Sequence, residues 1–120
     1  MPKPIESYRD LDVWQLAMDI VMDIYRVTQR FPSEEKFGLT SQIRRAAVSI
    51  PSNVAEGHSR LGAGEYRRFV SIARGSGAEV GTQLEIASRL GFVSVGEMAS
   101  TATDVDRLSK MLFSLYRRLA

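Results

Sequence analysis

Residues 38–60 read GLTSQIRRAAVSIPSNVAEGHSR, and this stretch decides how the chain can fold. On a helix turning about 100° per residue, its apolar side chains form one stripe. That stripe contains Leu39, Ile43, Ala46, Ala47, Ile50 and Val54. Short polar and charged residues form a second stripe beside it, at intervals of 3, 4, 4 and 3: Gln42, Arg45, Ser49, Asn53 and Glu56, with Arg44 at its edge. Short polar groups beside a core predict packing against another helix through hydrogen bonds, within the chain or between copies.

Working outward from this stretch, apolar residues recur at helical spacing in three further segments. The patterns predict helices over residues 11–30, 34–58, 63–90 and 95–119, and no alternating β pattern competes with them. Because the connections are short, we expect an all-α fold, an antiparallel up-down-up-down four-helix bundle. The 120 residues are enough for one domain, 1–120, in which residues 1–9 form a short N-terminal arm.

Several residues mark the expected ends of these helices. Asp10 and Ser33 have the chemistry of N-caps for the first and second helices. Gly91 is suited to the position after the third helix, where a left-handed backbone is favoured. Ser94 and Glu97 form a capping-box pattern at the start of the fourth helix.

Proline and glycine lie inside two of the predicted helices. Pro51 removes a backbone hydrogen bond, so we expect a kink or a short break near residues 47–51. Gly75, Gly77 and Gly81 cost helix stability, which predicts the close approach of another backbone there.

The third helix carries a polar row that mirrors the second stripe of residues 38–60. The row consists of Arg68, Ile72, Ser76, Glu79 and Gln83. We expect the two rows to face each other, with Glu79 paired to Arg45. Ser49, Asn53, Glu56 and Ser76 would complete this structural or oligomer contact.

The composition excludes several classes of site. There is no cysteine, and His58, expected on the surface, is the only histidine, so no thiolate or His-carboxylate metal set is present. There is also no Glu-x-x-His pair, nucleophile elbow or phosphate-binding loop. We therefore predict a protein that is not an enzyme and has no catalytic residues, metal or cofactor. The aromatic residues Tyr8, Trp14, Tyr25, Phe69 and Phe113 fit core positions.

No segment resembles a secretion signal or a membrane span. The N-terminus lacks an apolar region, and no apolar run approaches the roughly 18 residues that a span needs. We expect a cytoplasmic protein without a membrane partner.

The charge is small overall but unevenly distributed. The formal net charge is +2, whereas residues 44–74 hold six arginines and two acidic residues, a local charge of +4. Arginine suits planar and bidentate contacts. These arginines could face phosphates, or could pair with glutamates across helix interfaces. The candidates for phosphate contact are Arg60, Arg67, Arg68 and Arg74.

Three quoted segments support a resemblance to a known family. They are LDVWQLAMDIVMDIY, FPSEEKFGLTSQIRRAAVSIPSNVAEG and RRFVSIARGSGAEVGTQL, followed by a closing LG. Over residues 8–92 the chain resembles the four-helix bundle proteins encoded in intervening sequences of bacterial 23S ribosomal RNA genes. That family is similar to the accessory protein of diversity-generating retroelements, a basic pentameric barrel that binds nucleic acid and a reverse transcriptase.

The resemblance implies a four-helix bundle that assembles into a homo-oligomer, most often a pentamer. It also implies RNA or DNA as a partner, whereas a scaffold that recruits a protein without nucleic acid is the alternative. The motif residues that carry over are Arg44, Arg45, Ser49, Asn53, Glu56, Gly57, Gly75, Ser76 and Glu79.

Overall fold

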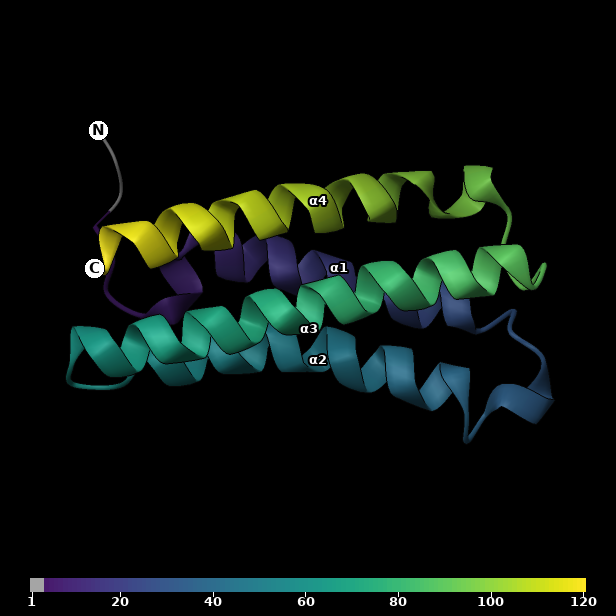
Figure 1. Ribbon diagram of the computed structural model, residues 1–120, viewed down its shortest axis with the longest axis horizontal. Coiled ribbons are helices and arrows are strands. Elements are labelled where there is room, and N and C mark those ends of the chain that lie inside the picture. Colours follow the sequence, from purple (N-terminus) through teal and green to yellow (C-terminus); the bar gives the residue numbers. More distant parts are fainter. Residues whose placement is uncertain (1–3) are drawn as a thin grey trace.

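The computed structural model describes residues 4–120 as an all-α four-helix bundle, which confirms the predicted fold class (Figure 1). The helices are α1 (Asp12–Thr28), α2 (Leu39–His58), α3 (Ala63–Arg89) and α4 (Val95–Arg118). Two short 3-10 helices, η1 (Tyr8–Asp10) and η2 (Ser33–Glu35), precede α1 and α2. No strand occurs in residues 4–120.

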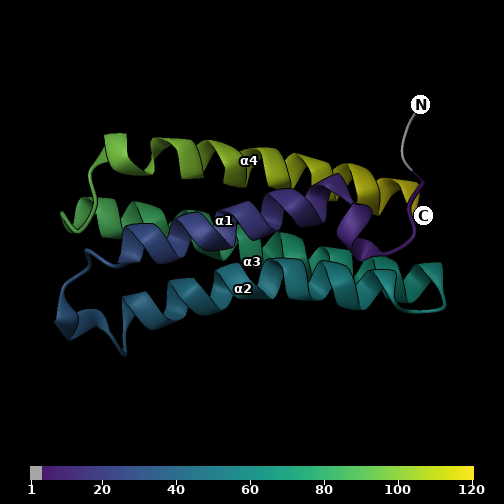
Figure 2. The ribbon, with the colours of Figure 1, turned by 180° about the vertical axis from the view of Figure 1, so that it is seen from behind.

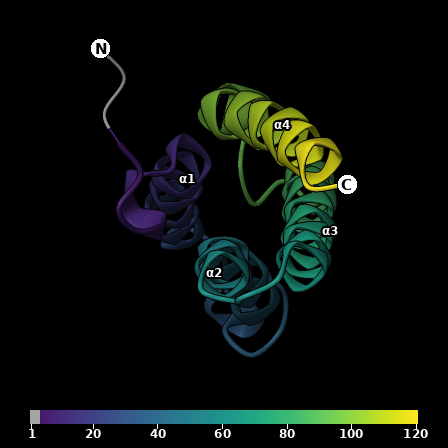
Figure 3. The ribbon, with the colours of Figure 1, turned by 90° about the vertical axis from the view of Figure 1, so that its left-hand side faces the viewer.

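The four helices surround one core, and each packs against two others. Helices adjacent in sequence are also adjacent in space, α1 closes the ring against α4, and the backbones of the diagonal pairs lie farther apart (Figure 3). Successive helices run in opposite directions, as Figure 1 and the view from behind in Figure 2 show. The C-terminus and the α2–α3 loop therefore lie at one end of the bundle, and η2 and the α3–α4 loop at the other.

Aliphatic side chains from all four helices fill the interior. Its largest fully buried members are Ile20, Ile24, Ile43, Ile50, Leu84, Leu108, Leu112, Val54, Val70 and Val80. The apolar stripe of residues 38–60 is buried from Ile43 to Val54, and only Leu39 is partly exposed. Burial of such a stripe contributes more to helix stability than intrinsic propensity does.

Two helices begin later than the sequence predicts. The N-cap of α2 is Gly38, not Ser33, and the side chain of Glu35 accepts a hydrogen bond from the N–H of Leu39 at 3.0 Å. Asp10 lies in η1, where its carboxylate accepts from the N–H of Ser7 at 3.1 Å instead of capping α1. In both places a short 3-10 turn precedes the α-helix, and a carboxylate of that turn accepts a backbone N–H: Asp10 at the start of η1 and Glu35 at the start of α2.

The expected N-terminal arm, residues 1–9, overlaps η1. Residues 1–3 of the predicted arm lie outside the described residues, and η1 shortens the remainder.

The predicted signals at the end of α3 and at the start of α4 are confirmed. Gly91 has φ 79°, and the N–H of Phe92 donates to the carbonyl of Ala87 at 2.9 Å, as in a Schellman motif. Both hydrogen bonds of the Ser94–Glu97 capping box are present.

α2 is continuous through Pro51, so of the two predicted outcomes, a kink or a short break, the break does not occur. The buried proline ring contributes to an apolar groove with Trp14 and Met18 of α1. Packing against α1 compensates there for the hydrogen bond that proline removes.

The close approach between helices occurs at Gly57, not at the three glycines of α3. A Cβ on Gly57 would lie 2.8 Å from the Cβ of Phe69 and 3.2 Å from the carbonyl oxygen of Tyr66. Gly77 faces only the end of a leucine side chain, at 3.9 Å, and Gly75 has nothing within 4 Å. The expectation for the α3 glycines is therefore wrong, because α4 meets Gly77 and Gly81 with side chains rather than with its backbone, and Gly75 faces open space.

We predict opposite effects of alanine at Gly57 and Gly75. Gly57→Ala should lower the free energy of unfolding by about 1–3 kcal/mol, because Phe69 and the α3 backbone must move away from the new methyl group. Gly75→Ala, the matched control, should raise it by about 0.5–1 kcal/mol through helix propensity alone. Urea denaturation followed by circular dichroism measures both, and equal effects would contradict the close approach.

Candidate nucleic-acid interface

The two polar rows predicted on α2 and α3 meet at a pair of serines. The hydroxyl oxygens of Ser49 and Ser76 lie 2.8 Å apart, and Ser76 is buried. The amide nitrogen of Asn53 donates to the carbonyl oxygen of Ser49 at 2.7 Å and to its hydroxyl at 2.9 Å. Hydrogen bonds between short side chains therefore lie at the centre of the α2–α3 interface, as the spacing predicts.

The expected ion pair between Glu79 and Arg45 is absent from residues 4–120. Both residues are exposed, so water already solvates their charges and a surface pair would add little. Arg44 also has a different role: its Nε donates to the hydroxyl of Thr28 at 2.8 Å, and its guanidinium lies 4.5 Å from the centre of the Tyr25 ring. Arg44 thus holds the C-terminal end of α1 against α2.

The four candidate arginines separate into two pairs with different surroundings. Arg60 and Arg68 lie over Phe69, at 5.1 and 5.3 Å from the ring centre. Each has an acidic neighbour: Arg60 donates to Glu56 at 2.7 Å, and Arg68 lies 3.5 Å from Glu65. Their charges are therefore largely balanced within the same cluster.

Arg67 and Arg74 instead lie over aromatic rings of α4. The guanidinium of Arg67 is 3.9 Å from the ring centre of Tyr116, and its Nε donates to the carbonyl of Tyr116 at 3.2 Å. The guanidinium of Arg74 is 4.7 Å from the ring centre of Phe113. None of the ion pairs among residues 4–120 involves either arginine.

Arg117 is a third member of this group that the sequence reasoning did not select. Its guanidinium lies 5.9 Å from the ring centre of Phe113, which precedes it by four residues in α4. A signal was present, since residues 107–120 contain four basic residues and no acidic one. The antiparallel return of α4 brings it beside the start of α3.

The predicted core position of two aromatic residues is wrong. Phe113 is 43% exposed and Tyr25 is 40% exposed, and each is covered by arginine instead of by the core. Tyr8, Trp14 and Phe69 are partly buried. Residues on the edge of an amphipathic stripe can point either way, and the aliphatic residues already fill the interior.

We call Arg67, Arg74, Phe113, Tyr116 and Arg117 the Arg–aromatic strip. Stacking on a ring restrains a guanidinium while leaving N–H groups free to donate. Without a nearby carboxylate, these N–H groups are available for an anion. The strip therefore has the chemistry to bind phosphates, with partly exposed rings beside them.

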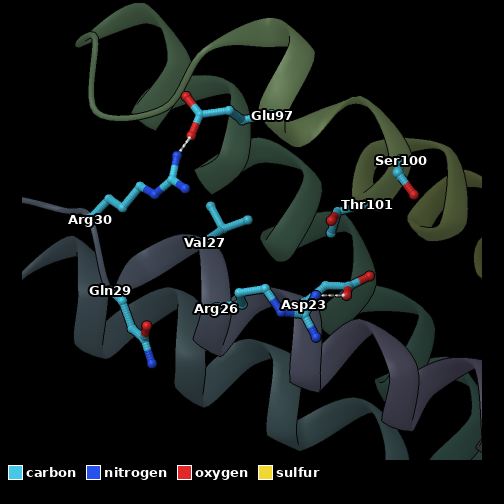
Figure 4. Close-up of a pocket in the computed structure, with 8 residues that line it drawn as sticks. All are labelled: Asp23, Arg26, Val27, Gln29, Arg30, Glu97, Ser100 and Thr101. Atoms are coloured by element: carbon cyan, nitrogen blue, oxygen red, sulfur yellow. Dashed lines mark hydrogen bonds and ion pairs between the residues drawn. The ribbon is translucent and has the colours of Figure 1, made fainter.

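A groove between α1 and α4, at the other end of the bundle, is electrically neutral (Figure 4). Its lining residues are Asp23, Arg26, Val27, Gln29, Arg30, Glu97, Ser100 and Thr101. Arg26 pairs with Asp23 at 2.8 Å within α1, and Arg30 pairs with Glu97 across to α4. Because each arginine has its own carboxylate, this groove is an ion-pair contact between helices and not an anion site.

His58 is half-buried against α3, and not on an exposed loop as predicted. Its ring makes an edge-to-face contact with Tyr66, with the ring centres 5.7 Å apart. Burial raises the pKa of the Tyr66 hydroxyl, and the nearby charge of Arg118 partly offsets this.

Within residues 4–120 no group of three or more histidine or acidic side chains is placed to hold a metal ion. Of the helices in this range, none has the length and apolar character needed to cross a membrane.

We predict that the serine pair couples α2 to α3. Ser49→Ala and Ser76→Ala should each lower the free energy of unfolding by about 1 kcal/mol, because each removes the hydrogen bond between the two hydroxyls at the α2–α3 interface. The double variant should lose clearly less than the sum of the two single variants. A double-mutant cycle by urea denaturation measures this coupling, and strict additivity would contradict a direct hydrogen bond.

We also predict an acid-dependent contribution from Glu97. The backbone N–H of Ser94 and then its hydroxyl lower the pKa of the Glu97 carboxyl below its ordinary value of 4.5, and Arg30 lowers it further. The stabilisation is therefore present above pH 4.5 and is lost as the pH falls through the lowered pKa. Glu97→Gln should flatten the fall in stability with pH over this range. Thermal unfolding of both proteins as a function of pH tests this, and parallel curves would refute it.

The comparisons with known proteins agree with this fold. A solved structure, described as a protein with unknown function from the S23 ribosomal protein family of Bacteroides thetaiotaomicron, superposes with a TM-score of 0.80. It is 20% identical, and the match covers 88% of this chain and 95% of that chain, so it shows a shared fold. The comparison with curated proteins finds no match.

The matching family model gives the identity of the chain. It is described as the 23S rRNA-intervening sequence protein, and it matches residues 9–114. Neither description names an enzyme activity. The match spans all four helices, so the chain belongs to the 23S rRNA-intervening sequence protein family.

Proposed function

We propose that this protein is a non-enzymatic homo-oligomer that binds the backbone of RNA or DNA through the Arg–aromatic strip. The observation that carries the proposal is that some arginines form ion pairs with carboxylates, whereas others lie against aromatic rings and form none. Arg67, Arg74 and Arg117 are held by aromatic rings and have no acidic partner among the described residues. The other end of the bundle instead pairs Arg26 and Arg30 with carboxylates.

An unpaired arginine is the more useful one for binding a polyanion. Each phosphate contact releases counterions from the nucleic acid, and this release contributes much of the binding free energy. An arginine that is already paired must first give up its carboxylate. The separation of paired and unpaired arginines allows a chain with a formal net charge of only +2 to have a strongly basic surface.

Assembly into an oligomer would multiply this surface. Ile72 and Ile86, on the outward side of α3, are 41% and 43% exposed, which provides apolar area for contact between copies. The family resemblance favours a pentamer. Several copies of a weak site on one ring would bind a long nucleic acid much more tightly than one copy does.

An apolar groove between α1 and α2 supports the alternative function, a scaffold that binds a protein partner. The cavity of ≈ 380 Å³ is lined by Tyr8, Trp14, Met18, Val21, Val48, Pro51, Ser52 and Ala55. It contains no charged side chain, so a helix or extended segment with apolar residues would suit it.

Removal of Arg74 and Arg117 from the Arg–aromatic strip tests the nucleic-acid proposal. Arg74→Ala with Arg117→Ala should weaken binding of a single-stranded RNA by about tenfold or more, since hydrogen bonds to charged groups contribute about 1.5–3 kcal/mol each. The slope of log K against log salt should become shallower by about 2, one for each lost phosphate contact. Fluorescence anisotropy over a salt series measures both quantities, and light scattering reports the assembly.

The matched control is Arg26→Ala with Arg89→Ala. These arginines lie in the last turns of α1 and α3, as Arg117 does in α4, and both are ion-paired, so the change in net charge is the same while the arginines removed have acidic partners. The control should bind RNA like the parent protein. Equal loss in both double variants would mean that net charge alone drives binding, and it would reject the strip as the site. Arg60→Ala with Arg68→Ala should have an intermediate effect.

A further inference from the structure

A second basic surface lies far from the Arg–aromatic strip, between the C-terminal half of α1 and the N-terminal half of α2. The structure has a cavity of ≈ 530 Å³ there, within the size range of small-molecule sites. We call it the basic cavity, and its lining residues are Tyr25, Lys36, Phe37, Thr40, Ser41, Arg44, Arg45 and Val48. Three of these residues are cationic and none is acidic.

The cations of the basic cavity differ in whether their side chains already have partners within the protein. Arg44 is committed to Thr28 and to the ring of Tyr25. Arg45 and Lys36 make no ion pair or side-chain hydrogen bond with another described residue. The charge of Arg44 therefore adds to the potential of the cavity, while Arg45 and Lys36 retain donors for a ligand.

The nearest acidic residue in the sequence lies outside the lining of the basic cavity. Glu35 precedes Lys36, its carboxylate accepts the N–H of Leu39 at 3.0 Å at the start of α2, and none of the ion pairs among residues 4–120 involves it. The next residues of α2, Thr40 and Ser41, line the cavity. Their N–H groups belong to the first turn, where a helix provides no internal acceptor and its dipole favours an anion.

The basic cavity also presents a ring to water. Phe37 is 90% exposed, so the face of its ring is available for stacking. The ammonium of Lys36 lies 5.6 Å from its ring centre, so a cation is already next to this ring. A flat ligand that stacks on Phe37 would thus have its phosphate close to the cations.

We propose that the basic cavity binds a phosphate monoester of a planar ring, a nucleoside monophosphate being the simplest example. Phe37 stacks on the planar ring, and Arg45 and Lys36 donate to the phosphate. Arg44 is a positioning residue that holds the end of α1 and adds positive potential. The site is separate from the Arg–aromatic strip, and its occupancy does not require binding of a long nucleic acid.

The test uses the full chain and three probes: adenosine 5′-monophosphate, adenosine and inorganic phosphate. Titration followed by ¹H–¹⁵N NMR should move the backbone signals of Lys36 to Val48 when the nucleotide is added. Adenosine and phosphate should each bind at least about tenfold more weakly, because each keeps only half of the contacts. Phosphate binding as tightly as the nucleotide would overturn the assignment, as would shifts confined to the region of Arg74 and Phe113.

Two variants and one control locate the contacts. Arg45→Ala and Phe37→Ala should each weaken nucleotide binding by about tenfold, in line with a charged hydrogen bond and a stacked base. Both side chains are exposed, so neither change should impair folding, which circular dichroism checks. Arg26→Ala removes the same charge outside the cavity and should leave the affinity within about twofold. No nucleotide shifts at about 10 mM, or parent-like binding by both variants, would refute the proposal.

Discussion

The close approach of α2 and α3 at Gly57 is the constraint on which the rest of the structure depends. The absence of a side chain at Gly57 lets the end of α2 lie against Phe69 and the backbone of Tyr66. This contact is at the α2–α3 loop, so it sets the distance between α2 and α3 where they begin to run side by side. The distance must remain short further along the interface, because Ser49 and Ser76 have side chains too small to bond across a wider gap. One glycine and one pair of hydroxyls thus define the packing of the central helix pair.

The chemistry of the surface follows from that packing. With α3 fixed against α2, its opposite flank is available to α4, which returns antiparallel and brings its basic C-terminal turns beside Arg67 and Arg74. The aromatic rings of α4 then separate cations that would repel one another if they met directly. At the other end of the bundle, carboxylates of α1 and α4 pair with Arg26 and Arg30. The two ends therefore differ in local charge, although the chain as a whole is almost neutral.

The two basic surfaces are built by different means. In the Arg–aromatic strip, residues of α3 and α4 stack in a row on an outer flank, which suits an extended polyanion. In the basic cavity, a turn before α2 folds Lys36 and Phe37 towards the groove between α1 and α2, which suits a small ligand. Neither surface includes Ser49, Asn53 or Ser76, which are hydrogen-bonded inside the α2–α3 interface. Within residues 38–60, Ser49 and Asn53 thus have a structural role, whereas Arg45 remains available to a ligand of the basic cavity.

The sequence by itself determined the helices, their order and much of their contact. Apolar spacing identified the buried faces, Ser94, Glu97 and Gly91 marked helix ends, and two matching polar rows predicted that α2 meets α3. These features depend on periodicity and short-range hydrogen bonds, which a linear pattern records. Only the tertiary structure decided which glycine permits a close approach, that Arg45 and Glu79 remain unpaired, and that Arg117 joins Arg74 over Phe113. The partner of a long charged side chain depends on its rotamer and on the rotation of neighbouring helices, and a change of one position along a helix turns a residue by about 100°. For this reason the spacing of residues predicted the bundle, whereas the packing of the helices decided which arginines have no acidic partner and can bind an anion.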